Sequence, residues 1–463
     1  MSTVGGGAGV GGEGEAPAVL LLSSKRAYPT EDFVAAAERL GVACVLATDR
    51  CHVLAGLWPE GALALDLSDP DGAAEALAAV HARRPLAGIV ATDERTAVIA
   101  ARAAERLGLA GNDVEAARCA ADKHRLRRRL SAAGRVQPRF AVVPARAAAP
   151  ELDAALVGLD FPVVLKPLHL SASRGVMRAD DRIQLDRRHA RLAALLDDPE
   201  VAALTPADPE RGPASAQVLI ESFVPGPELA FEGLLQGGRL RPLALFDKPD
   251  PLDGPFFAET MYVTPSRQSP AVQEAVVAEV AAAARAIGLR EGPVHAELRL
   301  APSAWAGTAR ARPVVAAGPD PDPLVPVLLE IAARAIGGLC HRSLRFGAGV
   351  SLEALLIAHA AGLDPDLLGP REAAASGVYM LPVPRPGVLR AVRGVDAARA
   401  VPGVRDVVIT VRPGEVMVPL PEGHSYLGFA FAAGDSPEVV TAALRRAVAC
   451  VEFDIATRVP ARP

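Results

Sequence analysis

From residue 19 onward, apolar runs of strand length alternate with helical segments, and this alternation restricts the fold more than any other feature. VLLLSS is followed by the helical EDFVAAAERL and then by the apolar GVACVLATD, and LAGIVATD with ERTAVIAARAAERLGL repeats the unit. The pattern predicts an open parallel sheet, whose ligand site would lie at the carboxyl ends of the strands. Because no G-x-G-x-x-G follows the first strand, a dinucleotide site is not expected.

Composition narrows the functional class. The 463 residues are 50% hydrophobic and 22% charged, which is enough apolar material for several cores. A net charge of −5 argues against a general nucleic-acid or anionic-membrane partner. We find neither a targeting signal nor an apolar run of about 18 residues, so we expect a cytoplasmic protein without a membrane span. Five scattered cysteines without C-x-x-C predict free thiols and no zinc site.

Lysine is scarce, because only four of the 49 basic residues are lysine. Lys166 ends the apolar strand VVLKP, and the small-residue stretch HLSASRGV, which includes Gly175, follows it. Small residues let a loop close over phosphates with its N–H groups turned inward, and a nearby lysine supplies a point charge. For this segment alone, a surface turn with a solvated lysine remains the commoner interpretation.

A second candidate is QVLIESFVPGPE, a buried strand that ends in a Pro-Gly turn. The backbone of residues 221–224 offers donors and acceptors for the edge of an adenine, and Glu228 would accept from ribose hydroxyls. The alternative is an ordinary strand end with a solvated glutamate.

Two glutamates, Glu297 and Glu330, lie inside otherwise apolar strands, where an unpaired charge is costly. A divalent cation would relieve that cost, and Mg²⁺ with a nucleotide phosphate prefers oxygen ligands. Arg334 and the Gly337–Gly338 pair follow with further donors. Salt bridges to the many arginines are the alternative.

These segments occur once each and in one order, and the chain resembles the ATP-grasp superfamily over roughly residues 18–460. In that family ATP lies between two α+β subdomains. Many members have an asparagine two residues after the second magnesium-binding glutamate, whereas this chain has Ala332. The pattern E-I-x-x-R-x-x-G-G is more similar to the L-amino acid ligase branch, as are DKP at 247–249, GPF at 254–256 and the pair Glu259–Thr260.

The resemblance implies a role for each candidate residue. The implied ATP-binding residues are Lys123, Lys166, Ser171, Ser173, Gly175, Val176, Glu221, Phe223, Val224 and Glu228. The implied ligands of Mg²⁺, with Mn²⁺ as an alternative ion, are Glu297 and Glu330. The implied catalytic residues are Arg334, Glu297, Glu330 and Lys166. Further candidates on the substrate side are His295, Arg267, Arg299, Lys248, Gly337 and Gly338.

The expected fold is α/β and α+β: an N-terminal open parallel α/β domain, a central ATP-grasp fold of two α+β subdomains and a small C-terminal α+β module. The expected boundaries are 1–17 for a disordered Gly-rich tail, 18–115 for the N-terminal domain, 116–368 for the ATP-grasp domain, about 160–224 for its small lid subdomain, and 369–463 for the C-terminal module. A flexible excursion is expected at about 301–325.

The resemblance implies an ATP-dependent carboxylate–amine ligase that forms an amide or peptide bond through an acylphosphate, with an amino acid as a substrate. A carboxylate and an amine would be its small-molecule partners, and a homodimer stays open. One alternative is an ATP-grasp carboxylase resembling biotin carboxylase. GEVMVPLPEG looks like a biotin-acceptor loop, but no lysine follows Met417, so the chain cannot carry biotin itself. The other alternative is an ATP-binding regulatory protein without catalysis.

Overall fold

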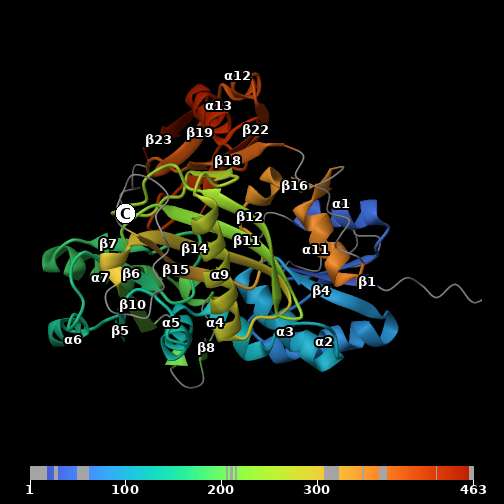
Figure 1. The fold of residues 1–463 in the computed structure, drawn as a ribbon, viewed down its shortest axis with the longest axis horizontal. Coiled ribbons are helices and arrows are strands. Elements are labelled where there is room, and N and C mark those ends of the chain that lie inside the picture. Colours follow the sequence, from blue (N-terminus) through green and yellow to red (C-terminus); the bar gives the residue numbers. More distant parts are fainter. Residues whose placement is uncertain are drawn as a thin grey trace, which may run out of the picture.

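The computed structural model describes residues 18–24, 30–49, 62–204, 207–208, 212–213, 216–306, 323–346, 349–363, 373–423 and 425–457. The predicted tail at 1–17, Lys25 and most of the predicted excursion at 301–325 lie outside these ranges. The described residues form an N-terminal parallel sheet, a small antiparallel lid sheet and one large antiparallel sheet, so the expected α/β and α+β fold class is confirmed (Figure 1).

The N-terminal sheet has the strand order β3-β2-β1-β4, and all its pairings are parallel, as predicted. Its strands are β1 (Ala18–Ser23), β2 (Cys44–Thr48), β3 (Ala62–Ala64) and β4 (Leu86–Ala91), and its helices are α1 (Thr30–Leu40), α2 (Pro70–Arg83) and α3 (Glu94–Leu107). Every residue of β1 is buried, as expected for a parallel strand covered on both faces. Asp93 caps α3 by accepting from the Thr96 N–H, which fixes where this helix begins.

Two helices, α4 (Val114–Ala121) and α5 (Lys123–Ala132), lead into the lid. The lid sheet has the order β5-β10-β6-β7. Its elements are β5 (Phe140–Pro144), α6 (Ala149–Ala155), β6 (Val163–Pro167), β7 (Met177–Ala179), α7 (Arg182–Leu196), α8 (Pro199–Ala202) and β10 (Gln217–Ser222), and the short strands β8 (Ala207–Asp208) and β9 (Gly212–Pro213) pair with each other. β5 lies upstream of the lid boundaries expected at about 160–224, and its pairing with β10 brings it into the same sheet.

The large sheet has the order β15-β14-β11-β12-β13-β18-β22-β20. Its strands are β11 (Glu228–Gln236), β12 (Arg239–Asp247), β13 (Met261–Thr264), β14 (Gly292–Pro302), β15 (Leu324–Ala332), β18 (Ala375–Pro382), β20 (Val404–Ile409) and β22 (Tyr426–Gly434). β11 and β12 form a hairpin around Gly237 and Gly238. β18, β20 and β22 lie within the expected C-terminal module, residues 369–463. Because β13 pairs with β18, the large sheet continues across the expected boundary.

The remaining elements cover and connect the sheets. They are α9 (Pro270–Ile287), α10 (Ser303–Ala306), the 3₁₀ helix η3 (Cys340–Ser343), β16 (Arg345–Phe346), β17 (Val350–Ser351), α11 (Leu352–Ala360), β19 (Gly387–Arg393), α12 (Val395–Arg399), β21 (Val416–Met417), α13 (Pro437–Cys450) and β23 (Glu452–Ala456). α9 packs across the large sheet, and α11 joins that sheet to β4 and α1. Figure 1 shows the lid elements grouped on the left, the N-terminal sheet on the right and the C-terminal elements at the top. Among the described residues, no helix is both long and apolar enough to cross a bilayer.

Candidate active site

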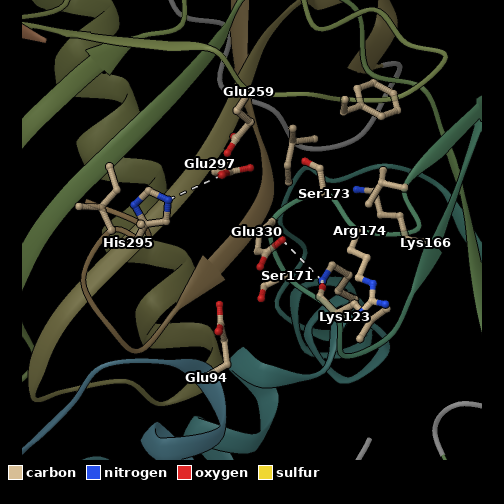
Figure 2. A pocket seen from close by; sticks show the side chains of 18 of the residues that line it. Glu94, Lys123, Lys166, Ser171, Ser173, Arg174, Glu259, His295, Glu297 and Glu330 are labelled. Carbon is tan, nitrogen blue, oxygen red and sulfur yellow. Dashed lines mark hydrogen bonds and ion pairs between the residues drawn. The ribbon is translucent and has the colours of Figure 1, made fainter. Parts of the chain in front are cut away.

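A cavity of about 450 Å³ lies where the three sheets meet (Figure 2). The carboxyl ends of the parallel strands contribute Ser24, Asp49, Thr92 and Asp93, so these strand ends face the cavity. Of the predicted site residues, those that line the cavity are Lys123, Lys166, Ser171, Ser173, Val176, Glu221, Phe223, Val224, Glu228, His295, Glu297, Arg299, Glu330, Arg334, Gly337 and Gly338. The geometry therefore brings together residues spread over more than 200 positions of the chain.

Two lysines approach one end of the cavity from different elements. Lys123 is the first residue of α5, and its Nζ donates to the Leu170 carbonyl at 2.8 Å and lies 3.7 Å from Glu330 Oε2. Lys166 projects from β6, with its Nζ 2.7 Å from Glu221 Oε2. Both side chains are about 12% exposed, so the two positive charges face a small, largely enclosed volume. Such a pair suits the oxygens of a phosphate chain.

Glu221 is buried between two cations, which sequence reasoning did not anticipate. Its Oε1 accepts from Arg127 Nε at 2.5 Å, and Arg127 also donates to the Leu329 carbonyl at 2.7 Å. Burial favours the neutral carboxyl, but Arg127 and Lys166 outweigh burial and lower the pKa of Glu221 to about 2. The Glu221 side chain therefore ties β10 to α5 and orients Lys166.

The segment expected to pair with adenine follows β10. The Phe223 N–H donates to the Pro162 carbonyl at 3.0 Å, and the Phe223 carbonyl accepts from Trp305 Nε1 at 3.1 Å. The Val224 carbonyl accepts from Arg299 Nη1 at 2.8 Å. The backbone groups of Phe223 are thus already partnered, so a base at this wall would depend on the backbone groups of the residues around it.

Glu297 and Glu330 lie directly opposite each other on β14 and β15. The register shifts immediately after Glu297, where a bulge leaves Leu329 outside the ladder. Directly opposed residues of an antiparallel pair point to the same face. The two side chains are 23% and 27% exposed, and Figure 2 shows both directed into the cavity. The two glutamates are therefore paired across neighbouring strands, although a long segment separates them in the sequence.

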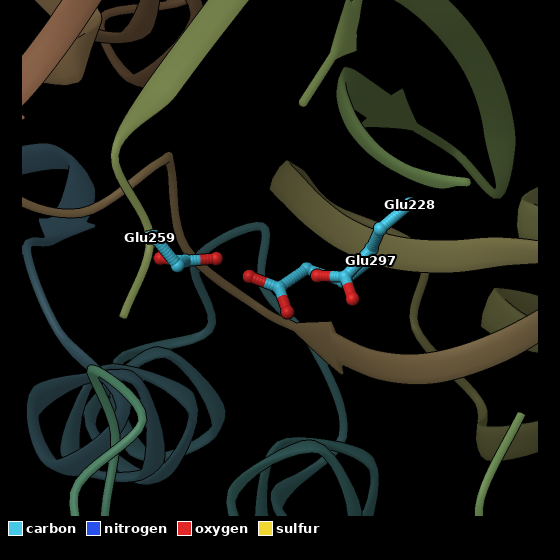
Figure 3. Close-up of side chains that lie close together, drawn as sticks. All are labelled: Glu228, Glu259 and Glu297. Carbon is cyan, nitrogen blue, oxygen red and sulfur yellow. The ribbon is translucent and has the colours of Figure 1, made fainter. Parts of the chain in front are cut away.

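A second set of carboxylates, Glu228, Glu259 and Glu297, has oxygens within 4.8 Å of one another (Figure 3). The Lys248 ammonium lies among them, 2.6 Å from Glu228 Oε1, 3.4 Å from Glu297 Oε1 and in contact with Glu259. A lysine already supplies the cation there, so we do not assign a metal to this trio. Lys248 was predicted to border the substrate; instead it lies behind the carboxylates and outside the cavity lining, with a side chain 2% exposed.

Charges in this region depend on burial and on Lys248. Burial raises the pKa of Glu259 to about 7 despite the Lys248 ammonium. Burial also opposes ionisation of Glu297, but Lys248 and His295 hold its pKa well below the usual range. His295 Nδ1 is hydrogen-bonded to Glu232 Oε1 at 2.7 Å, and His295 Nε2 lies 3.7 Å from Glu297 Oε1. His295 therefore bridges a fully buried glutamate to a cavity carboxylate.

Arg334 is held by a carboxylate from the N-terminal domain. Its Nε donates to Glu94 Oε1 at 2.9 Å, its Nη2 contacts the same oxygen, and its Nη1 donates to the Ala335 carbonyl at 2.8 Å. Although burial favours the neutral form of Glu94, Arg334 lowers the pKa of that carboxyl. Sequence reasoning missed Glu94, which directly follows the segment LAGIVATD and faces the cavity in Figure 2.

Two other predicted residues lie outside the lining. Arg267 is 54% exposed and donates to Asp247 Oδ2 through its backbone N–H at 2.9 Å and its Nε at 3.1 Å, so it faces away from the cavity and is not placed to bind substrate. Gly175 turns its N–H to the Pro421 carbonyl at 2.8 Å.

Arg299 does line the cavity, but Glu228 and the carbonyls of Val224 and Leu252 hold its guanidinium. We therefore assign Arg299 a structural role, in which it stabilises the part of the cavity lining formed by Val224 and Glu228.

Three family models match successive parts of the chain: an ATP-grasp N-terminal domain over residues 34–111, an ATP-grasp domain over residues 159–307 and an L-amino acid ligase C-terminal domain 2 over residues 379–456. The chain carries domains of the ATP-grasp superfamily. The predicted resemblance is thereby confirmed, and the C-terminal match supports the L-amino acid ligase branch in particular.

Relatives and solved structures agree with this assignment. The uncharacterised protein y4rH of Sinorhizobium fredii is 26% identical over 370 residues, which cover 80% of this chain and 68% of that protein. Alanine–anticapsin ligase of Bacillus subtilis is 27% identical over 212 residues, which cover 43% of this ATP-grasp chain and 42% of the ligase. The crystal structure of L-amino acid ligase from Bacillus licheniformis has the same fold, with a TM-score of 0.71 and 22% identity over 96% of this chain and all of that one.

Proposed function

We propose that this chain is an ATP-dependent ligase that joins a carboxylate to an amine, with an amino acid as one substrate. The observation that carries the proposal is the set of groups that line one cavity. They are Lys123 and Lys166 with a small-residue loop, the directly opposed pair Glu297 and Glu330, and Arg334 held by Glu94. The similarity to alanine–anticapsin ligase and to L-amino acid ligase supports this class of reaction.

Glu297 and Glu330 fit a divalent cation of the hard type, which the fold family implies. They are carboxylates, they are directly opposed on adjacent strands, and both remain partly exposed to the cavity. We assign them as the ligands of Mg²⁺. When bound, Mg²⁺ supplies positive charge that offsets the charge of the phosphate oxygens during phosphoryl transfer.

At the ATP end, Lys123 and Lys166 would bind the phosphate oxygens, and the loop of residues 171–176 would cover them. A carboxylate oxygen of the first substrate attacks the γ-phosphorus, the bond to the β-phosphate oxygen breaks, and ADP leaves with an acylphosphate remaining. The two lysine charges offset the negative charge that accumulates in this step. Exclusion of water by the loop protects the acylphosphate from hydrolysis.

In the second half-reaction, the amine attacks the acyl carbon and inorganic phosphate leaves with the oxygen that bridged carbon and phosphorus. Arg334 is the donor we assign to the oxyanion. Three of its five N–H groups have the partners described above, so the guanidinium is fixed in orientation while its other two donors can meet a ligand. Glu94 is therefore a positioning residue for Arg334.

The cavity also has groups that suit an amino acid. Glu94 and Glu259 supply carboxylates for an ammonium group, and Ile336, Met380 and Tyr426 add apolar surface to the lining. Tyr262 donates its hydroxyl to Glu259 Oε1 at 2.8 Å and thereby fixes that carboxylate. A charged ligand with an apolar side chain fits this combination.

The test is a phosphate-release screen of the whole chain with Mg-ATP and pairs of amino acids, with mass spectrometry of each active mixture. We expect ADP, phosphate and an amide in equal amounts, and no phosphate release from Glu330→Gln. The exposed-residue variant Glu115→Gln serves as the matched control and should behave like the wild type. Turnover that needs bicarbonate but no amine would favour the carboxylase alternative, and tight ATP binding without turnover in any mixture would favour the regulatory alternative.

A further inference from the structure

The lid is attached to the C-terminal part of the chain through the turn at residues 418–423. The Gly175 N–H donates to the Pro421 carbonyl at 2.8 Å, and Arg174 Nε donates to the Glu422 carbonyl at 2.8 Å. Arg191 of α7 donates to both carboxylate oxygens of Glu422, from Nε at 2.6 Å and from Nη2 at 2.8 Å. Lid and turn are therefore joined by one backbone–backbone hydrogen bond, one hydrogen bond from a side chain to a carbonyl, and one bidentate ion pair.

The same lid edge meets a second segment of the large-sheet region. Met177 forms a β-bridge with Phe256, and the Arg178 N–H donates to the Pro255 carbonyl at 3.0 Å. The Arg191 guanidinium lies 5.0 Å from the centroid of the Phe256 ring, which is a cation–π distance. Arg191 thus contacts both segments that hold this edge of the lid.

The turn fixes the loop that lines the ATP end of the cavity. Ala172 and Ser173 have φ values of +54° and +56°, a conformation that side-chain-bearing residues rarely adopt. Such a conformation persists where the surrounding structure holds it. The contacts of Arg174 and Gly175 with the turn come directly after these two residues, while Ser171 and Ser173 face the cavity (Figure 2).

We propose that Glu422 and Arg191 position the loop of residues 171–176 over the ATP phosphates, so that the C-terminal turn determines how long the lid remains closed. This inference rests on the proposed function, since it assigns the loop to ATP. It also gives a role to the segment GEVMVPLPEG, which looked like a biotin-acceptor loop in sequence. The Glu422 side chain is 39% exposed, so water can reach the contact and it can break and re-form during turnover.

The experiment compares Glu422→Gln with Asp197→Asn in the full-length chain. Asp197 pairs with Arg146 at 2.8 Å inside the lid. Its variant therefore removes a similar exposed charge but leaves the contact between the lid and the C-terminal turn intact. The two readouts are amide hydrogen exchange of the peptide containing residues 171–176 without nucleotide, and steady-state kinetics with the ratio of phosphate released to amide formed.

For Glu422→Gln we expect the amide exchange rate of this peptide and the KM for ATP each to rise about 1.5- to 5-fold, the range expected when an exposed ion pair is lost. We also expect more phosphate to be released per amide formed. Asp197→Asn should leave the exchange rate, the KM for ATP and the phosphate-to-amide ratio unchanged. The charge-swapped double variant Arg191→Glu with Glu422→Arg should restore slow amide exchange. Equal exchange rates in Glu422→Gln, Asp197→Asn and wild type would overturn the proposal. If the wild type makes no amide but Glu422→Gln alone exchanges faster, the ligase assignment fails and the positioning role stands.

Discussion

At the level of single residues, the three described lysines have two distinct environments. Lys123 and Lys166 line the cavity, whereas Lys248 is buried among three glutamates. Lys25 lies outside the described residues. The sequence did not separate a lysine that faces the cavity from one that is an internal counter-ion, because both kinds are lysines next to carboxylates.

This difference predicts opposite effects for two similar substitutions. Lys248→Met should destabilise the fold by about 3–5 kcal/mol, because it leaves buried carboxylates without a cation. Lys123→Met should change the free energy of unfolding little and should instead raise the KM for ATP about tenfold or more, since its ammonium faces the cavity. Urea unfolding and steady-state kinetics of both variants are the measurements. Equal loss of stability in the two would contradict the distinct environments.

Glu221 gives a pH prediction. Its pKa is about 2 in the folded chain against an ordinary 4.5, a difference worth about 3 kcal/mol. A lowered pKa contributes stability above the unfolded value, and the contribution is lost as the pH falls from about 4.5 through 2. Glu221→Gln should therefore unfold more easily at pH 7 and lose less further stability between pH 5 and pH 3 than the wild type. The exposed control Glu415→Gln should keep the wild-type slope, and an unchanged slope in Glu221→Gln would contradict this account.

At the level of elements, the sequence predicted the parallel N-terminal strands and the strands that became β6 and β10, because apolar periodicity and turn residues are local signals. The carboxylate cluster around Lys248 and the Glu94–Arg334 pair were not predicted, since they depend on how separate elements meet. The continuation of the large sheet through β18 has the same cause, because strand order across a sheet is a tertiary property.

The turn between β10 and β11 predicts a stability difference between two glycines. Gly226 has φ +101°, and a Cβ there would lie 2.0 Å from the Leu300 carbonyl oxygen. Gly237, in the β11–β12 hairpin, has φ +56° with open space around it. Gly237→Ala should cost about 1–2 kcal/mol from backbone conformation alone, and Gly226→Ala a further 1–3 kcal/mol from the steric clash. Thermal unfolding of both variants measures this, and equal costs would contradict the close approach of β14.

At the level of the whole molecule, the large sheet joins the central and C-terminal regions into one unit. β13 pairs with β18 over four residue pairs, and Met261 and Val263 are buried with residues of α13 and β22. A chain ending at residue 368, the predicted boundary of the ATP-grasp domain, would expose this edge and these side chains. We expect it to aggregate or to lack the near-UV circular dichroism of the full chain. A monomeric truncated chain with the same signal and the same affinity for ATP would contradict this view.

The central claim is that one cavity activates a carboxylate with ATP and passes the acyl group to an amine. The most direct test uses an amino acid carrying ¹⁸O in its carboxylate, in the active mixture found by the screen. The account predicts that each amide formed is accompanied by one inorganic phosphate containing one ¹⁸O atom, because the carboxylate oxygen bridges carbon and phosphorus in the acylphosphate. Phosphate without ¹⁸O, or the release of AMP and pyrophosphate, would contradict it.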